Sequence, residues 1–304
     1  MASHSPTEIR LQDLTALKQK ADVFLLPETG KKSLTGIGNT YSPFKSRGLD
    51  FQEVRVYQPG DDIRQIDWHI TAKYGKPFTK LYTEEKERTL FFVVDLRSNM
   101  YFATHGDFKA IMAARLTAFM ASIADHQKDR IGYCILTDTG IISCDQPDMN
   151  LLPQLLHDLT HVNKRKQSAG DFTTLLQSIP QLISAGSFIF IFSDFSNWTE
   201  TQSKLLIPLS EKNTILLGLL YDTLEVEIPM DTLPFSNGRE IITITPQDKK
   251  IHKQFKTEWQ QHQNYLRKTA HKYDWGFLPM ATDSDYITTL CQFCFGEASH
   301  ATGN

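Results

Sequence analysis

The feature of the sequence that most constrains the fold is a set of short, continuous apolar runs. The clearest is Phe188-Ile189-Phe190-Ile191-Phe192, and the runs from Leu90 to Val94 and from Thr214 to Tyr221 are of the same kind. Apolar runs of this length without polar alternation are typical of strands buried on both faces of a parallel sheet. The sequence therefore predicts an α/β fold with a doubly wound, mostly parallel sheet.

Segments with helical periodicity separate these runs. A weak apolar repeat from Leu11 to Ala21 predicts a short N-terminal helix, and Asn237-Gly238 predicts a hairpin within 225–245. The other expected helices cover 108–127, 151–159, 174–183, 199–209, 247–273 and 286–295. The other expected strands cover 90–95, 130–137, 140–144, 187–193, 214–221 and 275–278.

We expect three parts in the chain. Residues 1–35 are an N-terminal helix and a linker, and the stretch from 30 to 48 is rich in loop-forming residues. Residues 36–88 form a small β-rich segment, because apolar and polar residues alternate with period two from Leu49. Residues 89–300 carry the alternating strands and helices of the main domain.

The composition argues against several classes of protein. The 304 residues carry a formal net charge of −3, so the chain has no general positive field to attract nucleic acid. No apolar run approaches the roughly 18 residues that span a bilayer, and the N-terminal segment lacks a signal-peptide core. We therefore expect a cytoplasmic protein without a transmembrane segment. Among the four cysteines, Cys291 and Cys294 form one Cys-x-x-Cys pair, and these two are expected to be small apolar fillers.

Two of the predicted strands end in an acidic residue. Asp95 follows the run Leu90 to Val94, and Asp194 follows the run that ends at Ser193. Ligands of open α/β sheets bind outside the carboxyl ends of the strands, so these two side chains mark a candidate site. Carboxylate and hydroxyl oxygens together suit a hard divalent cation such as Mg²⁺.

This layout resembles the von Willebrand factor A-like fold and its metal-ion-dependent adhesion site. That site uses Asp-x-Ser-x-Ser after the first strand, a Thr from a second loop and an Asp from a third. Asp95 matches the first Asp, and Arg97 and Asn99 stand where the two serines would be. Thr173 matches the Thr, and Asp194 matches the third-loop Asp.

Arg97 changes what such a site can bind. Its guanidinium has no lone pair to offer a metal and stays charged, so it would repel the ion or replace it by bridging Asp95 and Asp194. We expect a degenerate site without a metal. If Mg²⁺ is bound after all, its ligands would be Asp95, Thr173 and Asp194.

A second set of polar residues surrounds a Pro-Gly turn upstream of the main domain. Its members are Arg55, Tyr57, Pro59, Gly60, Asp61, Asp62, Arg64, Asp67 and Trp68. Gly60 permits a tight turn, and the arginines are suitable partners for the acids. A structural charge network is the favoured interpretation, with Trp68 burying its ring. A hydrolase that uses Asp61, Asp62 and Asp67 is a less favoured alternative.

From about Gly36 to Phe295, the chain resembles the bacterial family named "domain of unknown function 58". The Pro-Gly-Asp-Asp to Asp-Trp segment and the element Tyr221-Asp222-Thr223-Leu224-Glu225 carry the resemblance. It implies a von Willebrand factor A-like domain with an N-terminal β insert, in the short soluble form of the family. It also implies an adaptor that works with a MoxR-type AAA+ ATPase, and no catalytic activity is established for the family.

These observations lead to one functional expectation and one main alternative. We expect a non-catalytic protein-binding scaffold or adaptor, with its contact surface at Asp95, Arg97, Asn99, Thr173 and Asp194. Trp198 is either an exposed anchor of that surface or a core residue. The alternative is a divalent-metal-dependent ligand-binding domain. The sequence has no Gly-x-x-x-x-Gly-Lys-Ser/Thr phosphate loop, so an ATPase would have to be a separate protein.

Overall fold

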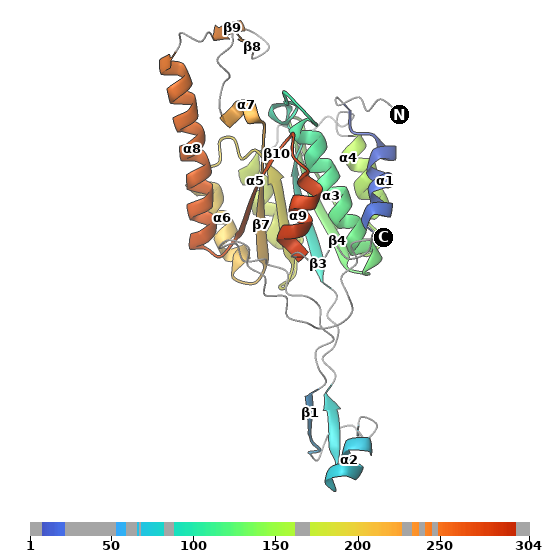
Figure 1. Ribbon diagram of the computed structural model, residues 1–304. Helices are drawn as coiled ribbons and strands as arrows, with labels where there is room; N and C mark the ends of the chain where they lie inside the picture. Colours follow the sequence, from blue (N-terminus) through green and yellow to red (C-terminus); the bar gives the residue numbers. More distant parts are fainter. Residues whose placement is uncertain are drawn as a thin grey trace, which may run out of the picture.

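A six-stranded mixed sheet forms the centre of the molecule in the computed structural model (Figure 1). The structure describes residues 8–21, 53–58, 66, 68–81, 88–161, 171–226, 233–236, 241–244 and 249–295. The strand order is β10-β7-β6-β3-β4-β5, and only the edge strand β5 runs antiparallel to its neighbour. The strands are β3 (Thr89–Asp95), β4 (Arg130–Thr137), β5 (Gly140–Ser143), β6 (Phe188–Ser193), β7 (Thr214–Tyr221) and β10 (Gly276–Ala281).

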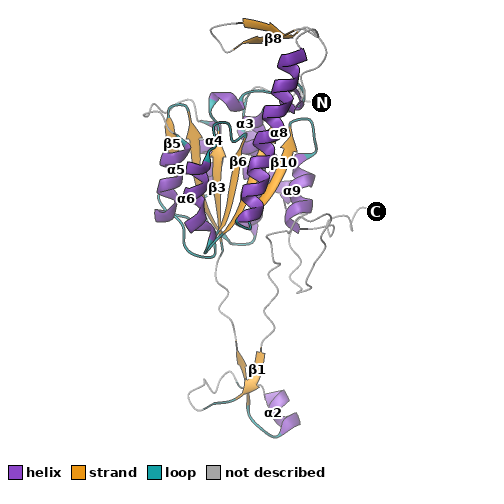
Figure 2. Cartoon of the chain, turned by 90° about the vertical axis from the view of Figure 1, so that its left-hand side faces the viewer, coloured by secondary structure: helices purple, strands orange, loops and turns teal. Residues whose placement is uncertain are grey.

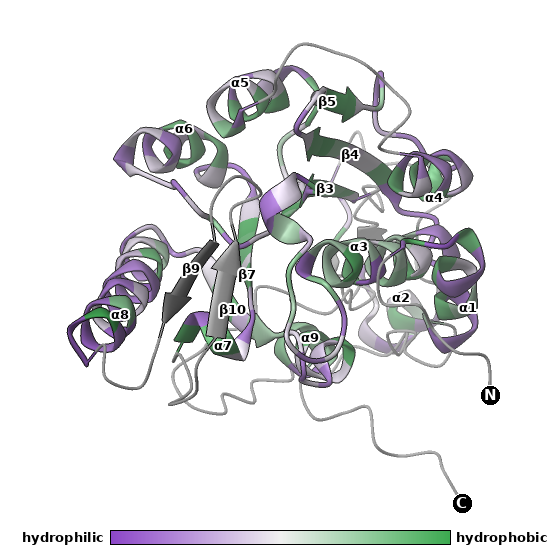
Figure 3. Cartoon of the chain, turned by 90° about the horizontal axis from the view of Figure 1, so that it is seen from above, coloured by the Kyte–Doolittle hydropathy of each residue, from purple (hydrophilic) through white to green (hydrophobic). Residues whose placement is uncertain are grey.

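Helices cover both faces of this sheet, as Figure 3 shows from above. One face carries α1 (Leu11–Ala21), α3 (Lys109–His126), α4 (Leu152–Thr160) and α9 (Tyr286–Phe295). The other carries α5 (Phe172–Ser178), α6 (Glu200–Ser210) and α8 (Lys249–Lys272). The α/β fold expected from the sequence is confirmed. The arrangement is consistent with a Rossmann-like or von Willebrand factor A-like doubly wound fold.

The continuous apolar runs form strands because both of their faces are buried. In β3, Phe92 and Val94 pack against the α3 side, while Phe91 and Val93 pack against the α5 and α6 side. Successive side chains of a strand point to opposite faces, so a strand between two helical layers needs apolar residues at every position. Helix α3 is itself buried almost all round, since it lies between the sheet and the outer helix α1.

Most of the expected elements are present. The expected hairpin of 130–144 is formed by β4 and β5, and the one within 225–245 is formed by β8 (Leu233–Ser236) and β9 (Ile241–Ile244). Residues 237–240, which include Asn237-Gly238, lie outside the described residues. The sequence did not predict helix α7 (Thr223–Val226) or the short 3₁₀ helix Ser98–Met100, and the expected helix 174–183 ends in the 3₁₀ turn Ile179–Gln181.

The described residues upstream of β3 contain a helix as well as strands. Strands β1 (Glu53–Val56) and β2 (Phe78–Leu81) pair antiparallel, and helix α2 (Trp68–Tyr74), which lies between them in the sequence, is beside this hairpin (Figure 2). Gly75, with φ of +67°, follows α2 and donates its backbone N–H to the Thr71 carbonyl, a common helix ending. The Trp68 ring is 67% exposed, so the expectation that it is buried was wrong.

None of the helices in the described ranges is both long and apolar enough to cross a bilayer. All four cysteines are buried and free, and Cys291 and Cys294 are thus buried as expected of apolar fillers. Burial is the main cause that raises the pKa of the Cys134 and Cys291 thiols to about 12.

Candidate functional site

The candidate site lies where the order of strands reverses. From β3, the chain continues to β4 and β5 on one side of the sheet, and to β6, β7 and β10 on the other. The carboxyl ends of β3 and β6 therefore flank the topological switch point, where α/β sheets bind ligands. Asp95 is the last residue of β3, and Asp194 directly follows β6. We call these strand ends and the loops 95–101 and 194–199 the rim.

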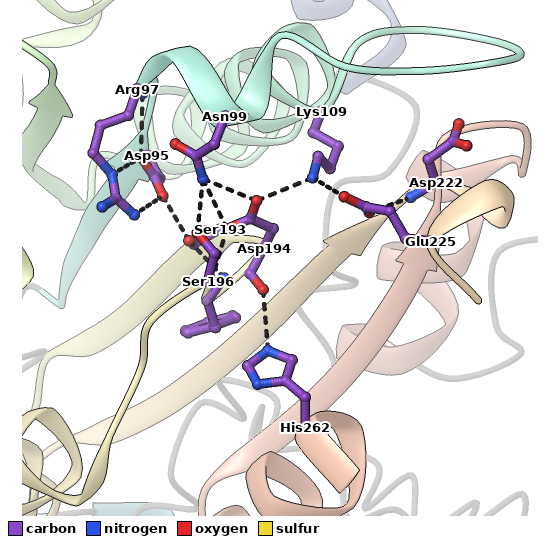
Figure 4. Close-up of polar contacts among 11 residues, drawn as sticks. Asp95, Arg97, Asn99, Lys109, Ser193, Asp194, Ser196, Asp222, Glu225 and His262 are labelled. Carbon is purple, nitrogen blue, oxygen red and sulfur yellow. Dashed lines mark hydrogen bonds and ion pairs between the residues drawn. The ribbon is translucent and has the colours of Figure 1, made fainter. Parts of the chain in front are cut away.

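Asp95 is fully buried and is paired within its own loop. Arg97 donates from Nε to Oδ1 at 2.9 Å and from Nη2 to Oδ2 at 2.8 Å, and Ser193 Oγ donates to Oδ2 at 2.7 Å (Figure 4). The guanidinium also lies 5.0 Å from the centre of the Phe172 ring. Burial alone would lower the pKa of Arg97, but the hydrogen bonds and charge of Asp95 outweigh it and raise that pKa. Asp95 and Arg97 therefore form a charged pair with fixed geometry.

Asp194 is held by a different set of donors. Asn99 Nδ2 lies 3.1 Å and 2.9 Å from the two carboxylate oxygens, and the Ser196 backbone N–H donates to Oδ1 at 2.9 Å. Lys109 Nζ donates to Oδ2 at 3.0 Å. Burial would raise the pKa of Asp194, but Lys109 and Ser196 together hold it below its ordinary value of 3.8.

Lys109 is the site residue that the sequence did not reveal. It is the first residue of α3, it is 1% exposed, and its Nζ also donates to Glu225 Oε1 at 2.5 Å. Burial would lower its pKa, but Asp194 and Glu225 raise it, so the ammonium stays charged. The one available signal was a charged residue at the start of an otherwise apolar helix, and that signal does not say which acids it meets.

Asp222 fixes the position of Glu225. Its buried carboxylate accepts hydrogen bonds from Thr104 N at 2.8 Å, Thr104 Oγ1 at 2.7 Å, Thr282 Oγ1 at 2.8 Å and Leu224 N at 2.9 Å. The Asp222 backbone N–H donates to Glu225 Oε2 at 2.9 Å. The element from Tyr221 to Glu225 thus joins the end of β7 to the rim.

The structure shows which partners Arg97 and Thr173 have at this surface. Arg97 pairs with Asp95, while the cation on Asp194 is Lys109, so the expected bridge by Arg97 is not formed among the described contacts. Thr173 Oγ1 accepts a hydrogen bond from Gln202 at 3.1 Å, and the described hydrogen bonds do not connect it to Asp95 or Asp194. A loop position alone could not show this, because the first turn of α5 directs Thr173 toward α6.

Trp198 is a core residue, which decides between the two interpretations that the sequence left open. It is 6% exposed, and its ring packs edge-on against Phe172 at 5.4 Å and Phe195 at 5.2 Å. Its Nε1 donates to Ser203 Oγ at 3.0 Å, which satisfies the buried indole N–H. The core alternative is therefore confirmed.

Comparison with known proteins identifies the family. A family model with the description "Protein of unknown function DUF58" matches residues 53–265. The chain belongs to the DUF58 family. Uncharacterized protein Mb1516 of Mycobacterium bovis and Uncharacterized protein Rv1480 of Mycobacterium tuberculosis are each 29% identical to it over 134 residues. The matched region covers 43% of this chain and 42% of each relative, so the chain spans less than half of their length.

Much of the upstream DUF58 motif falls outside the described residues: Pro59, Gly60, Asp61, Asp62, Arg64 and Asp67. Arg55 lies in β1, and the half-buried Tyr57 donates its backbone N–H to the Pro77 carbonyl at 2.8 Å. The proposed charge network around the turn stays a prediction. The later motif element, from Tyr221 to Glu225, is the part that the structure joins to the rim.

The rim of this DUF58 chain does not fit a divalent metal ion. Mg²⁺ needs about six oxygen ligands at about 2.0–2.1 Å. Both oxygens of Asp95 accept from the Arg97 guanidinium, and an oxygen of Asp194 accepts from the Lys109 ammonium. Within the described ranges, no group of three or more His, Cys, Asp or Glu side chains could hold a metal. A divalent ion would have to displace two cations that the protein itself supplies.

Proposed function

We propose that this DUF58 chain is a non-catalytic scaffold or adaptor built on a von Willebrand factor A-like domain, and that the rim is its protein contact surface. The strand order, the antiparallel edge strand and the position of Asp95 and Asp194 at the switch point support this interpretation. Ser98 and Asn99 are exposed at the rim, so a partner can reach it.

The internal pairing of the rim acids is the observation that carries the proposal. General acid–base catalysis needs a group with a pKa near the working pH. Here the pKa of Asp194 is lowered, while the pKa values of Arg97 and Lys109 are raised, so each of these groups is held in its charged form. This pattern supports a fixed binding surface more than a reaction centre.

The proposed partner is a MoxR-type AAA+ ATPase, and the proposed place of action is the cytoplasm. The family resemblance supports this partner class. The sequence has no phosphate-binding loop of the P-loop type, which fits an adaptor that depends on a separate ATPase.

Two alternatives have weaker support. A metal-dependent ligand-binding domain conflicts with the two internal cations at the rim. A hydrolase centred on Asp61, Asp62 and Asp67 rests on residues outside the described part of the chain. It predicts turnover of a phosphodiester or glycoside that is lost in Asp61→Asn or Asp67→Asn variants of unchanged stability.

Capture of the ATPase by matched surface variants tests the proposal. Ser98→Arg places a bulky cation on the exposed rim, where Asp138 accepts from the Ser98 backbone at 2.9 Å and can pair with it. Ser143→Arg makes the same change at an exposed position on the edge strand β5. Wild type and Ser143→Arg should copurify with a MoxR-type AAA+ ATPase from native cells, and Ser98→Arg should lose it. Equal capture by all three proteins, or by none, would overturn the proposal.

A further inference from the structure

The ammonium of Lys109 has two carboxylate partners that differ in accessibility. The side chain of Asp194 is 10% exposed and is fixed by Asn99 and Ser196 as well as by Lys109. The side chain of Glu225 is 27% exposed and lies across the ammonium from Asp194 (Figure 4). Glu225 is therefore the more exposed of the two partners of Lys109.

Lys109 occupies a position where a cation is energetically unfavourable. The first turn of a helix carries the positive end of the helix dipole, which disfavours a cation there. Burial adds a desolvation penalty, and apolar side chains of similar volume often replace buried ion pairs without loss of stability. Lys109 and its two carboxylates thus form a buried charged group at the switch point, where α/β sheets bind ligands, and this place suggests a binding role.

Within the described residues, the Glu225 carboxylate is held by fewer donors than the Asp194 carboxylate. Glu225 lies on α7, a helix of four residues, and its backbone N–H donates to the Asp222 carbonyl at 2.9 Å. Its carboxylate has two described donors, Lys109 Nζ and the Asp222 backbone N–H. A rotation of the Glu225 side chain would remove both of these contacts and leave Asp194 in place.

We propose that Lys109 forms a carboxylate-binding site at the rim, that Glu225 is its internal occupant, and that an acidic side chain of the protein partner takes the place of Glu225. The inference rests on the proposed function for its partner, but the binding site itself can be tested without one. When a partner carboxylate replaces Glu225, Lys109 still has two acidic partners, Asp194 and the new carboxylate. Lys109 itself then supplies the positive charge that a metal ion would otherwise supply.

Acetate is a suitable probe, because it is a small carboxylate whose methyl group stands for the end of the Glu225 side chain. In wild type, Glu225 competes at the effective concentration of a tethered group, which is at least in the millimolar range. Glu225→Ala removes that competitor. Glu211→Ala is the matched control, since Glu211 is an exposed glutamate at the end of α6. Each protein is unfolded by heat in increasing sodium acetate and in sodium chloride of equal ionic strength.

Acetate should raise the Tm of Glu225→Ala in a saturable way, by about 3 to 5 °C more than chloride does. For wild type and for Glu211→Ala, acetate should change the Tm no more than chloride does. If Glu225→Ala does not fold, Glu225→Asp withdraws the carboxylate by one methylene and should show a smaller acetate response. If the folded Glu225 variant shows the same Tm in acetate as in chloride, the proposed carboxylate-binding site is overturned.

This result is independent of partner capture. An acetate response without ATPase capture would preserve the Lys109 site and reject the proposed function. ATPase capture without an acetate response would preserve the proposed function and reject the Lys109 site. If both hold, Glu225→Ala should bind the ATPase at least about tenfold more tightly than wild type, because the internal competitor is gone. If Glu225→Ala binds the ATPase no more tightly than wild type does, the proposed replacement of Glu225 by a partner carboxylate is overturned.

Discussion

Arg97 holds both carboxylate oxygens of Asp95, the residue two positions before it, at 2.9 Å and 2.8 Å. The first acid of the rim and its cation therefore come from one loop. A bidentate guanidinium is rigid and stays charged at all ordinary pH values. The rim thus has a cation built into its first loop, directly beside a buried carboxylate.

The first prediction concerns metal binding. Mg²⁺ and Mn²⁺ should give no saturable heat in calorimetric titration at millimolar concentrations, because Arg97 and Lys109 already neutralise the rim acids. EDTA should leave the Tm unchanged. Stoichiometric binding that disappears in Asp194→Asn would contradict this interpretation and favour the metal-dependent alternative.

The second prediction concerns the Asp95–Arg97 pair. Arg97→Met should lower the free energy of unfolding by about 3 kcal/mol, because it leaves a fully buried carboxylate without its cation. Asp95→Asn should also be destabilising. The double variant Asp95→Asn/Arg97→Met should recover most of the loss, since the charge and its partner are then both absent. Urea unfolding of the four proteins measures the coupling, and additive losses would show that the pair is not coupled.

The third prediction concerns acid stability. Lys109 and Ser196 hold the folded-state pKa of Asp194 below its ordinary value of 3.8, despite the opposing effect of burial. Its contribution is therefore complete above about pH 4 and is lost as the pH falls through the lowered pKa. Wild type should be more stable than Asp194→Asn at pH 7, and the difference should shrink below pH 4. A difference in urea midpoint that is constant from pH 7 to pH 3 would contradict this.

The sheet and its helices could be predicted because their signals are local. A strand buried on both faces is a continuous apolar run, and the runs that end at Val94, Phe192 and Tyr221 all became sheet strands. The upstream segment gave no such signal. Helix α2 has no fully buried residue, and its β-branched and aromatic residues favour a strand by local propensity.

The site could be predicted only as far as its partners are close in sequence or lie at strand ends. Arg97 is two residues from Asp95, so the pair was visible in the sequence. Lys109 lies 85 residues from Asp194 and 116 from Glu225, and no local pattern joins residues so far apart. The convergence of Asp95 and Asp194 followed from the rule that parallel strands share a carboxyl edge.

The fourth prediction distinguishes a buried tryptophan from an exposed one. Trp198→Phe should lower the free energy of unfolding by about 1 to 2 kcal/mol, since it removes the hydrogen bond to Ser203 and part of a buried ring. Trp68→Phe makes the same change where the ring is 67% exposed and should alter stability by less than about 0.5 kcal/mol. Urea unfolding measures both. Equal effects would contradict the burial of Trp198.

The fifth prediction concerns the loop that Asp222 holds beside the rim. Gly106 has φ of +76°, and a Cβ there would overlap the carbonyl oxygen of Thr282, a residue whose hydroxyl donates to Asp222 at 2.8 Å. Gly186 has φ of +88° and open space where a methyl group would lie, so Gly186→Ala isolates the backbone penalty, about 1 kcal/mol. Gly106→Ala should cost at least about 2 kcal/mol more, because Thr282 or the loop must move.

The two alanine variants also connect the loop to the Lys109 site. Displacement of Thr282 by Gly106→Ala would loosen Asp222, which orients Glu225 through its backbone N–H at 2.9 Å. A loosened Glu225 competes less well for Lys109, so acetate should stabilise Gly106→Ala more than chloride does. Gly186→Ala, far from this network in sequence, should show no difference between the salts. The same response to acetate in both variants would show that Asp222 does not transmit the change.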